Sequence, residues 1–175
     1  MKTYFFIFVG LIVLAFSSCN MDSVSNNQPS ILFYKQPVLN GKTTLGGVVT
    51  TDYYLLDTIS VGDTVSLYMY LDGYTNNLVS YTMTLSGDSV TKLVLPRVSA
   101  MDSIFLSTSN YNKGIFYFSG KVNSIVFPFK YVAKKVNSEA KIVFNLVSDA
   151  NFEYNERTFI IKTPIVAKND SIKVN

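Results

Sequence analysis

Two stretches in which apolar and polar residues alternate constrain this chain more than any other feature. In residues 64–71, TVSLYMYL, every odd-numbered residue is apolar, and residues 79–85, VSYTMTL, repeat the pattern with hydroxyl residues at the even positions. Because successive side chains of a β-strand point to opposite faces, a period of two is typical of a strand with one buried face. We therefore predict half-buried antiparallel strands in both stretches.

The rest of the chain continues this β pattern. Short apolar runs rich in Tyr, Val, Ile, Phe and Thr, the residues that favour strands, alternate with turn signals about every 8–12 residues. Further strands are predicted at 31–36, at one or two places within 46–59, and at 90–95, 103–107, 114–119, 124–136, 140–148 and 157–164. The predicted total is about eight to ten short strands with no amphipathic helix.

Local signals add detail to two of these strands. Ser86, Gly87 and Asp88 predict a tight hairpin turn, so that residues 90–95 pair back on the strand before the turn. In residues 124–136 the odd-numbered residues from Ile125 to Ala133 share one face, while Lys130 and Lys134 lie on the other. Pro128 in the same strand predicts an edge position or a bulge, because proline has no N–H to donate to a neighbouring strand.

This pattern predicts an all-β fold, a single antiparallel β-sandwich, with a small barrel as the alternative. The motif Val61-Gly62-Asp63-Thr64-Val65 resembles the turn that enters a strand in many bacterial immunoglobulin-like domains. The resemblance implies an immunoglobulin-like sandwich, which we place at residues 31–167. Residues 168–175 are predicted to be a frayed tail.

The first nineteen residues have the features of an export signal. Lys2 is positively charged, residues 4–16 are uncharged and apolar, and the small residues Ser17 and Ser18 precede Cys19. The apolar run of thirteen residues fits a signal peptide and falls short of the ~20 residues that a membrane-spanning helix needs.

Small residues directly before a cysteine resemble the lipobox of bacterial lipoproteins. The resemblance implies that residues 1–18 are a cleaved signal peptide and that Cys19 becomes the mature N-terminus. It also implies that the Cys19 thiol carries lipid, which anchors the protein to a membrane. The alternatives are an ordinary secretory signal with an incidental cysteine, or an uncleaved anchor. Lipidation would also explain the single cysteine of an exported chain, because one thiol cannot form an internal disulfide.

Residues 19–30 are polar and show no periodicity, so we predict a flexible tether between the lipid and the domain. A protein anchored in this way is expected in the outer membrane or at the cell surface. A domain that faces the periplasm is the alternative.

A triplet of Asp, then Ser or Thr, then an aliphatic residue occurs six times, whereas composition predicts ~0.7 occurrences. The triplet resembles the O-glycosylation sequon of exported Bacteroidota proteins, and with the leader it suggests a Bacteroidota-type source. The resemblance implies glycans on the hydroxyls of Ser23, Thr58, Thr64, Ser89, Ser103 and Ser171. The alternative is a turn-to-strand signature, since Asp favours turns and β-branched residues favour strands.

Residue types that carry catalysis or bind metals are scarce. The chain has no histidine, and its one cysteine is assigned to lipidation, which argues against Ser-His-Asp, Cys-His and zinc sites. The alternating oxygen ligands of residues 149–156 suit calcium, but we expect an ordinary polar loop there. We therefore predict no catalytic residues, no metal and no cofactor, and a protein that is not an enzyme.

Aromatic side chains offer the best remaining binding surface. Tyr68, Tyr70, Tyr74 and Tyr111 are expected on an outer face or in loops, where flat rings can stack on sugars. Ordinary cross-strand packing of these rings is the alternative. The net charge of +3 is too small to predict binding to nucleic acid.

The leading hypothesis is a non-enzymatic, lipid-anchored envelope protein that acts as a binding or accessory module. Its partners would be the membrane, through the lipid at Cys19, and a glycan or another envelope protein. Two alternatives are a glycan-binding accessory of a polysaccharide-uptake system and a structural subunit of a surface assembly, in which sheet edges pair by strand addition.

Overall fold

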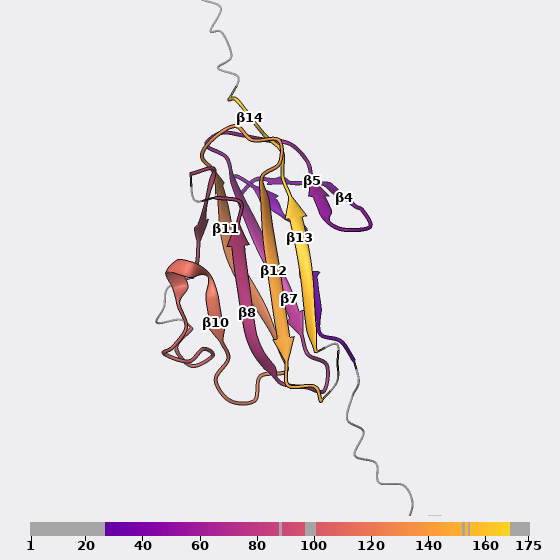
Figure 1. The fold of residues 1–175 in the computed structure, drawn as a ribbon. Coiled ribbons are helices and arrows are strands. Elements are labelled where there is room, and N and C mark those ends of the chain that lie inside the picture. The colour runs from indigo at the N-terminus through magenta and orange to yellow at the C-terminus, as the bar shows by residue number, and fades with distance from the viewer. Residues whose placement is uncertain (1–26, 88, 97–100, 152, 154, 169–175) are drawn as a thin grey trace, which may run out of the picture.

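A computed structural model describes residues 27–168 except 88, 97–100, 152 and 154, and in these residues the protein is all-β (Figure 1). The only helical element of the described part is a single turn of 3-10 helix, η2 (Tyr111–Lys113). Cys19, and with it the predicted signal peptide and most of the tether, lies outside the described residues.

The strands form two large sheets and one small one. Sheet A has the order β3–β2–β7–β11–β9, and β1 also pairs with β7. Its strands are β1 (Ser30–Phe33), β2 (Val38–Leu39), β3 (Thr43–Thr44), β7 (Thr64–Asp72), β9 (Thr91–Val94) and β11 (Ser124–Ala133).

Sheet B has the order β10–β8–β12–β13–β5–β4. Its strands are β4 (Gly47–Val49), β5 (Tyr54–Leu56), β8 (Leu78–Leu85), β10 (Ile115–Tyr117), β12 (Lys141–Ser148) and β13 (Glu156–Lys162). The small sheet joins β6 (Ile59–Ser60) to β14 (Ile165–Val166). Most pairings are antiparallel, as predicted, but β13 pairs with β5, and β14 with β6, in parallel.

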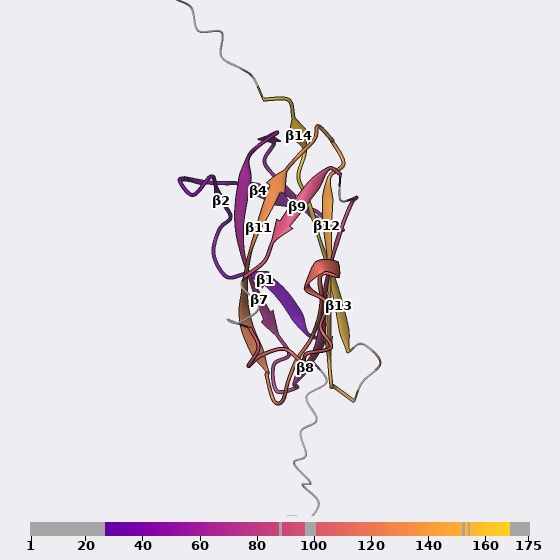
Figure 2. The same ribbon diagram turned by 90° about the vertical axis from the view of Figure 1, so that its left-hand side faces the viewer.

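Sheets A and B lie face to face (Figure 2), and aromatic side chains fill the space between them. The ring of Tyr81 on β8 lies 5.3 Å from the ring of Phe127 on β11, measured between centroids. Phe129 on β11 lies 5.8 Å from Phe144 on β12 in the same way. All four side chains are buried, so the hydrophobic core lies between the two sheets and aromatic contacts join them.

The predicted alternation is confirmed in β7 and β11. In β7 the apolar residues at odd positions are fully buried, and the residues between them are half-buried. In β11 the buried side chains run from Phe127 to Ala133 at every second residue, while Lys130 is exposed. Because both strands present one apolar face, this face turns towards sheet B and the other towards solvent.

The predicted hairpin between β8 and β9 is wrong. The strand after the turn pairs with β11 of sheet A, whereas β8 lies in sheet B between β10 and β12. Both edges of β8 are therefore taken for most of its length, and the chain crosses from one sheet to the other between the two strands. The turn residues predict a reversal of direction, but they do not fix which strand becomes the neighbour.

Pro128 occupies an edge position, as predicted. It lies opposite Tyr68 of β7, and β9 covers β11 only from Lys130 onwards. The N–H of Lys134 donates to the carbonyl of Val90 on the side of β9. By alternation, the ring nitrogen of Pro128 also faces that side, where no strand pairs with it in the described residues.

The structure differs from the sequence prediction in two further places. Val79 is 43% exposed, although the alternation placed it inward. The pairing of β8 with β12 passes from Ser80 directly to Leu78, which makes Val79 the extra residue of a bulge and turns Leu78 inward. The strand predicted at 103–107 is reduced to an isolated bridge between Phe105 and Phe118.

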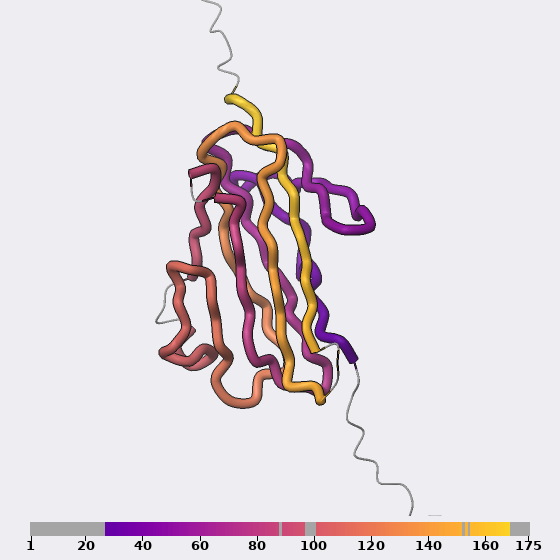
Figure 3. The backbone as a smooth tube through the Cα atoms, in the orientation of Figure 1, coloured from indigo at the N-terminus to yellow at the C-terminus, as the bar shows by residue number. Residues whose placement is uncertain are grey.

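The two ends of the described chain lie at opposite ends of the elongated domain (Figure 3). Near the N-terminal end, the Gln28 side chain donates a hydrogen bond to the carbonyl of Glu156 at 2.7 Å. The C-terminal end follows β14. Within the described residues, no helix has the length and apolar character to span a membrane.

Candidate functional site

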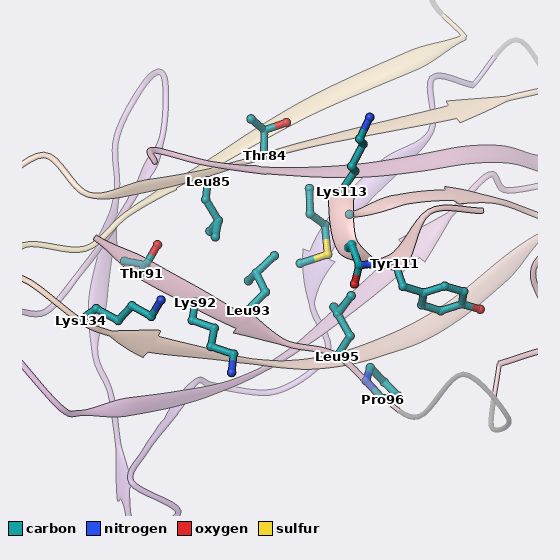
Figure 4. Close-up of a pocket in the computed structure, with 13 residues that line it drawn as sticks. Thr84, Leu85, Thr91, Lys92, Leu93, Leu95, Pro96, Tyr111, Lys113 and Lys134 are labelled. Carbon is teal, nitrogen blue, oxygen red and sulfur yellow. The ribbon is translucent and has the colours of Figure 1, made fainter. Parts of the chain in front are cut away.

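A groove of about 660 Å³ opens along one edge of the domain, between the end of β8, β9 and η2 (Figure 4). We call this recess the β8–β9 groove. Its lining residues are Met83, Thr84, Leu85, Thr91, Lys92, Leu93, Leu95, Pro96, Tyr111, Asn112, Lys113, Gly114 and Lys134. Its size falls in the range of small-molecule sites, which is about 300–1,000 Å³.

The groove lies where the edges of both sheets are uncovered in the described part of the chain. In sheet B, the shorter neighbour of β8 reaches only to Gly114, whose carbonyl accepts a hydrogen bond from the N–H of Met83 at 2.8 Å. In sheet A, β11 is the only strand that pairs with β9 among the described residues. The side chains of Leu85 and Leu93, which point inward by their strand phase, are therefore only half-buried.

Gly114 fixes the wall of the groove where η2 ends. It has φ of +65°, and a Cβ atom at this position would lie 2.5 Å from the carbonyl oxygen of Met83. The side chain of Asn110 caps the start of η2 by accepting a hydrogen bond from the N–H of Lys113 at 3.1 Å. The side-chain cap at the start of this turn and the glycine conformation at its end thus position Lys113 at the rim.

Lysine side chains surround an apolar floor in the groove. Figure 4 shows Lys92 and Lys134 on one side and Lys113 on the other, with Leu85, Leu93 and Leu95 between them. No aspartate or glutamate is among the described lining residues. Such an arrangement gives the recess a positive potential and an aliphatic interior.

Tyr111, one of the four tyrosines predicted to bind glycans, lies at the end of this groove. Its ring makes an edge contact with Phe116 at 5.4 Å between centroids. Partial burial, with a smaller contribution from the negative charge of Asp102, raises the pKa of the Tyr111 phenol. Tyr111 therefore belongs to the groove and to its aromatic packing, and not to a platform of several tyrosines.

Tyr68 and Tyr70 lie together on the outer face of sheet A, as the alternation of β7 requires. The Nζ atom of Lys35 sits 3.6 Å from the centroid of the Tyr68 ring. A shallow recess of about 390 Å³ beside Tyr68 is lined by Pro128 and Lys130, among other residues. This surface, which we call the tyrosine face, presents flat rings beside positive charge.

Sequence reasoning missed Tyr34, which extends the tyrosine face. Tyr34 is 64% exposed, and its N–H donates to the carbonyl of Tyr68 at 2.8 Å. The residue lay inside a predicted strand, but its neighbour could be known only from the pairing of β1 with β7. Tyr74, in contrast, lies beyond the end of β7 in the turn to β8, with φ of +58°.

The Ser and Thr residues of the Asp-Ser/Thr-aliphatic triplets differ in their exposure to solvent. Thr58, Ser89 and Ser103 are exposed residues of turns and loops. Thr64 is half-buried at the start of β7, and its N–H donates to the side chain of Asn40 at 2.8 Å. Ser23 and Ser171 lie outside the described residues.

The Asp63 triplet also has a structural role, as the turn-to-strand alternative predicted. The carboxylate of Asp63 accepts hydrogen bonds from the Ser60 N–H at 2.8 Å and from the Asn40 side chain at 2.7 Å. These bonds close the turn that leads into β7.

Two other acidic side chains also make structural contacts, and one of them, Asp149, belongs to the loop considered for calcium. The Asp149 carboxylate accepts hydrogen bonds from the backbone and the side chain of Asn77, each at 2.7 Å. Asp72 accepts one from the Tyr74 N–H at 2.8 Å. Across the described residues, no three side chains of the His, Cys, Asp and Glu types lie close enough to hold a metal ion together.

In comparisons with known proteins, the chain matches no protein-family model and no curated protein.

Proposed function

We propose that this protein is a lipid-anchored protein of the bacterial cell envelope whose β-domain acts as a non-enzymatic binding or accessory module. The observation that carries the binding role is the β8–β9 groove, a recess of ligand size with a charged rim and an apolar floor. Its described lining contains no carboxylate, and the chain has no histidine. These residues suit holding a ligand better than general acid–base chemistry.

The anchor and location rest on the leader. Residues 1–18 have the charge, apolar length and small residues of a lipoprotein signal, and Cys19 follows directly. Acylation of Cys19 would anchor the domain to the outer membrane or the cell surface through the tether of residues 19–30, with a periplasmic orientation as the alternative. We also propose that the two facing sheets are immunoglobulin-like in the broad sense, in line with the turn at Val61–Val65.

The test of the anchor is to express the full chain in a Gram-negative host and analyse its N-terminus by mass spectrometry. We expect a mature chain that begins at an acylated Cys19 and fractionates with membranes, and a Cys19→Ala variant that is neither acylated nor membrane-bound. Ser18→Ala keeps a small residue before the cysteine, so this control should remain lipidated. An unmodified N-terminus upstream of Cys19 would contradict the proposal.

A second candidate function is glycan binding at the tyrosine face, as an accessory of a polysaccharide-uptake system. It is favoured by the neighbouring outward rings of Tyr34, Tyr68 and Tyr70 and by the lysine over Tyr68. A glycan array with the full chain should then give a signal that Tyr68→Ala and Tyr70→Ala abolish. Tyr117→Ala, which removes an exposed ring from sheet B, is the matched control and should keep it.

A structural role in a surface assembly is favoured by the exposed edge strand β4. Within the described ranges this strand pairs only with β5, and its residues Val48 and Val49 are 64% and 78% exposed. An uncharged edge of this kind can pair with a strand of another chain. Stoichiometric co-purification of one envelope protein, lost when Val48 is replaced by Lys, would support this role over a ligand-binding role.

We also propose that the exposed triplets carry O-linked glycans. Accessible hydroxyls in turns, at Thr58, Ser89 and Ser103, are the best acceptors among the described residues, while Thr64 is held at a strand start. Intact-mass and peptide analysis of protein from its native host should find glycan on at least one of the exposed sites. Glycan on Thr64 alone would contradict this ordering.

A further inference from the structure

We propose that the β8–β9 groove binds a single-chain amphipathic anion, in which a carboxylate or phosphate head group is joined to an aliphatic chain. This inference names the ligand class of the groove, so it rests on the proposed function as a binding module. The lysines at the rim would hold the head group, and the aliphatic chain would lie on the apolar floor between them.

The charge at the rim selects an anion. Lys92 and Lys113 lie on opposite sides of the groove (Figure 4), and neither has an ion-pair partner among the described residues. Lys134 also lines the groove but already has an interaction of its own. Lys92 and Lys113 are therefore the two lysines that would bind the anion. Their side chains extend outward at the margin of the groove (Figure 4), and no carboxylate is among the described lining residues.

The floor selects an aliphatic chain over a sugar. It is formed by Met83, Leu85, Leu93 and Leu95, whose flexible or branched side chains give no flat surface. Sugars bind best to flat aromatic rings, and the one ring of the lining, Tyr111, is engaged edge-on with Phe116. An aliphatic chain would pack on leucine and methionine without needing hydrogen bonds.

The position of the groove explains why such a chain would bind there. Leu85 and Leu93 are in the inward phase of their strands but remain half-buried, because no described strand covers either sheet edge at this point. An aliphatic chain inserted between β8 and β9 would cover these side chains and extend the hydrophobic core to this edge.

The test uses dodecanoate with a photoreactive diazirine on its chain, added to the full-length protein in its native membranes. Peptide mass spectrometry after irradiation should place the adducts on residues 83–85 and 91–96. The double variant Lys92→Gln and Lys113→Gln keeps the side-chain length but removes both charges, and we expect it to lower the labelling about tenfold or more.

Control variants and competitors make the result specific. Lys42→Gln with Lys121→Gln removes two exposed lysines outside the groove and should leave the labelling unchanged. Excess unlabelled dodecanoate or dodecyl phosphate should compete, and whichever competes better identifies the head group. Acetate and inorganic phosphate should not compete, because they lack the chain. A thermal unfolding scan of each variant confirms that the fold is intact.

Three outcomes would overturn the inference. Equal labelling by photoreactive dodecanol would show that the lysines do not select an anion. Adducts spread over exposed apolar residues such as Val48 and Val49, without enrichment in the groove, would show non-specific partition. Absence of groove adducts, in a protein that is acylated at Cys19 and retains another partner in a pull-down, would reject the ligand class and leave the binding role standing.

Discussion

At the scale of single residues, the least expected feature is the fully buried phenol of Tyr81. Its ring stacks on Phe144 and Phe116 in the centre of the core, but its hydroxyl has no hydrogen-bond partner among the described residues. Burial raises the pKa of this phenol well above its ordinary value. A hydroxyl that loses its hydrogen bonds to water without replacing them costs on the order of 1–3 kcal/mol.

We therefore expect Tyr81→Phe to leave the stability of the protein unchanged or to raise it by about 1 kcal/mol, because the ring contacts stay and the unpaired hydroxyl goes. Urea unfolding monitored by circular dichroism measures the change. Tyr117→Phe, which removes an exposed hydroxyl, is the control and should fall within about 0.5 kcal/mol of the parent protein. A loss of more than about 1 kcal/mol in Tyr81→Phe would show that the hydroxyl has a partner.

A second buried phenol makes stability depend on alkaline pH. Burial raises the pKa of Tyr131 to about 12, while the nearby hydroxyls of Thr163 and Thr91 oppose this increase. In the part of the chain that the structure describes, no group meets hydrogen-bond geometry with the phenol oxygen of Tyr131. The fold thus favours the protonated phenol, so its contribution to stability is complete below pH 10 and is lost as the pH rises from 10 towards 12.

We expect unfolding free energies measured at pH 9, 10 and 11 to fall more steeply for the parent protein than for Tyr131→Phe. The full loss attributable to this one residue is on the order of 2 kcal/mol. Contributions from all other groups are the same in both proteins and cancel in the comparison. Parallel stability curves for the two proteins would mean that Tyr131 does not titrate differently in the folded and unfolded states.

At the scale of elements, the groove depends on how η2 ends. Gly114 has a positive φ, and it also approaches the carbonyl of Met83 so closely that no side chain fits. Gly120 has a similar φ of +68° but open space around its Cα. The two glycines therefore separate the cost of the backbone conformation from the cost of the close contact.

We expect Gly120→Ala to lower stability by about 1–2 kcal/mol, the cost of a left-handed conformation in a residue with a side chain. Gly114→Ala should cost about 1–3 kcal/mol more, because β8 and η2 must move apart. Thermal and urea unfolding of both variants provides the comparison. Equal losses in the two variants would mean that the contact with Met83 relaxes without cost.

Elements were predicted well where a local pattern defines them and poorly where a distant partner does. The inward residues of β7, β11 and β12 follow from alternation alone. The partner of β9 does not, because the turn after Leu85 allows the next strand to join either sheet. Val79 was misplaced for the same reason: its bulge exists only in relation to β12.

At the scale of the whole molecule, Phe127 joins the two sheets more directly than its neighbours on β11. It is fully buried, and its ring contacts those of Tyr81, Phe105 and Phe116. Its removal would leave a cavity between sheets A and B that the surrounding rings can fill only in part.

We expect Phe127→Ala to destabilise the domain by about 3–5 kcal/mol, a large share of the total stability of a small domain. Lys130→Ala, on the exposed face of the same strand, is the matched control and should change stability by less than about 0.5 kcal/mol. Chemical denaturation of both variants gives the values. A cost near 1 kcal/mol for Phe127→Ala would show that the core closes around the missing ring.

The candidate sites, too, were predicted where a local pattern places a residue and missed where distant segments of the chain meet. Tyr68 and Tyr70 were placed on one face by the alternation of β7, and the structure agrees. Tyr34 was missed, and the position of Tyr111 at the groove was not predicted, because their neighbours come from distant parts of the chain. The β8–β9 groove had no sequence signal, since its lysines and leucines come from four separate segments of the chain.

The sequence by itself determined the all-β class and most of the buried residues, because burial in a strand repeats every second residue and needs no knowledge of the partner. It also determined the features on which the proposed anchor rests, which are local to the first nineteen residues. Only the tertiary structure decided which strands pair and where the sheet edges stay uncovered. The pairing of β9 with β11 instead of β8 created the groove, and such pairings depend on contacts between distant residues that no local pattern encodes.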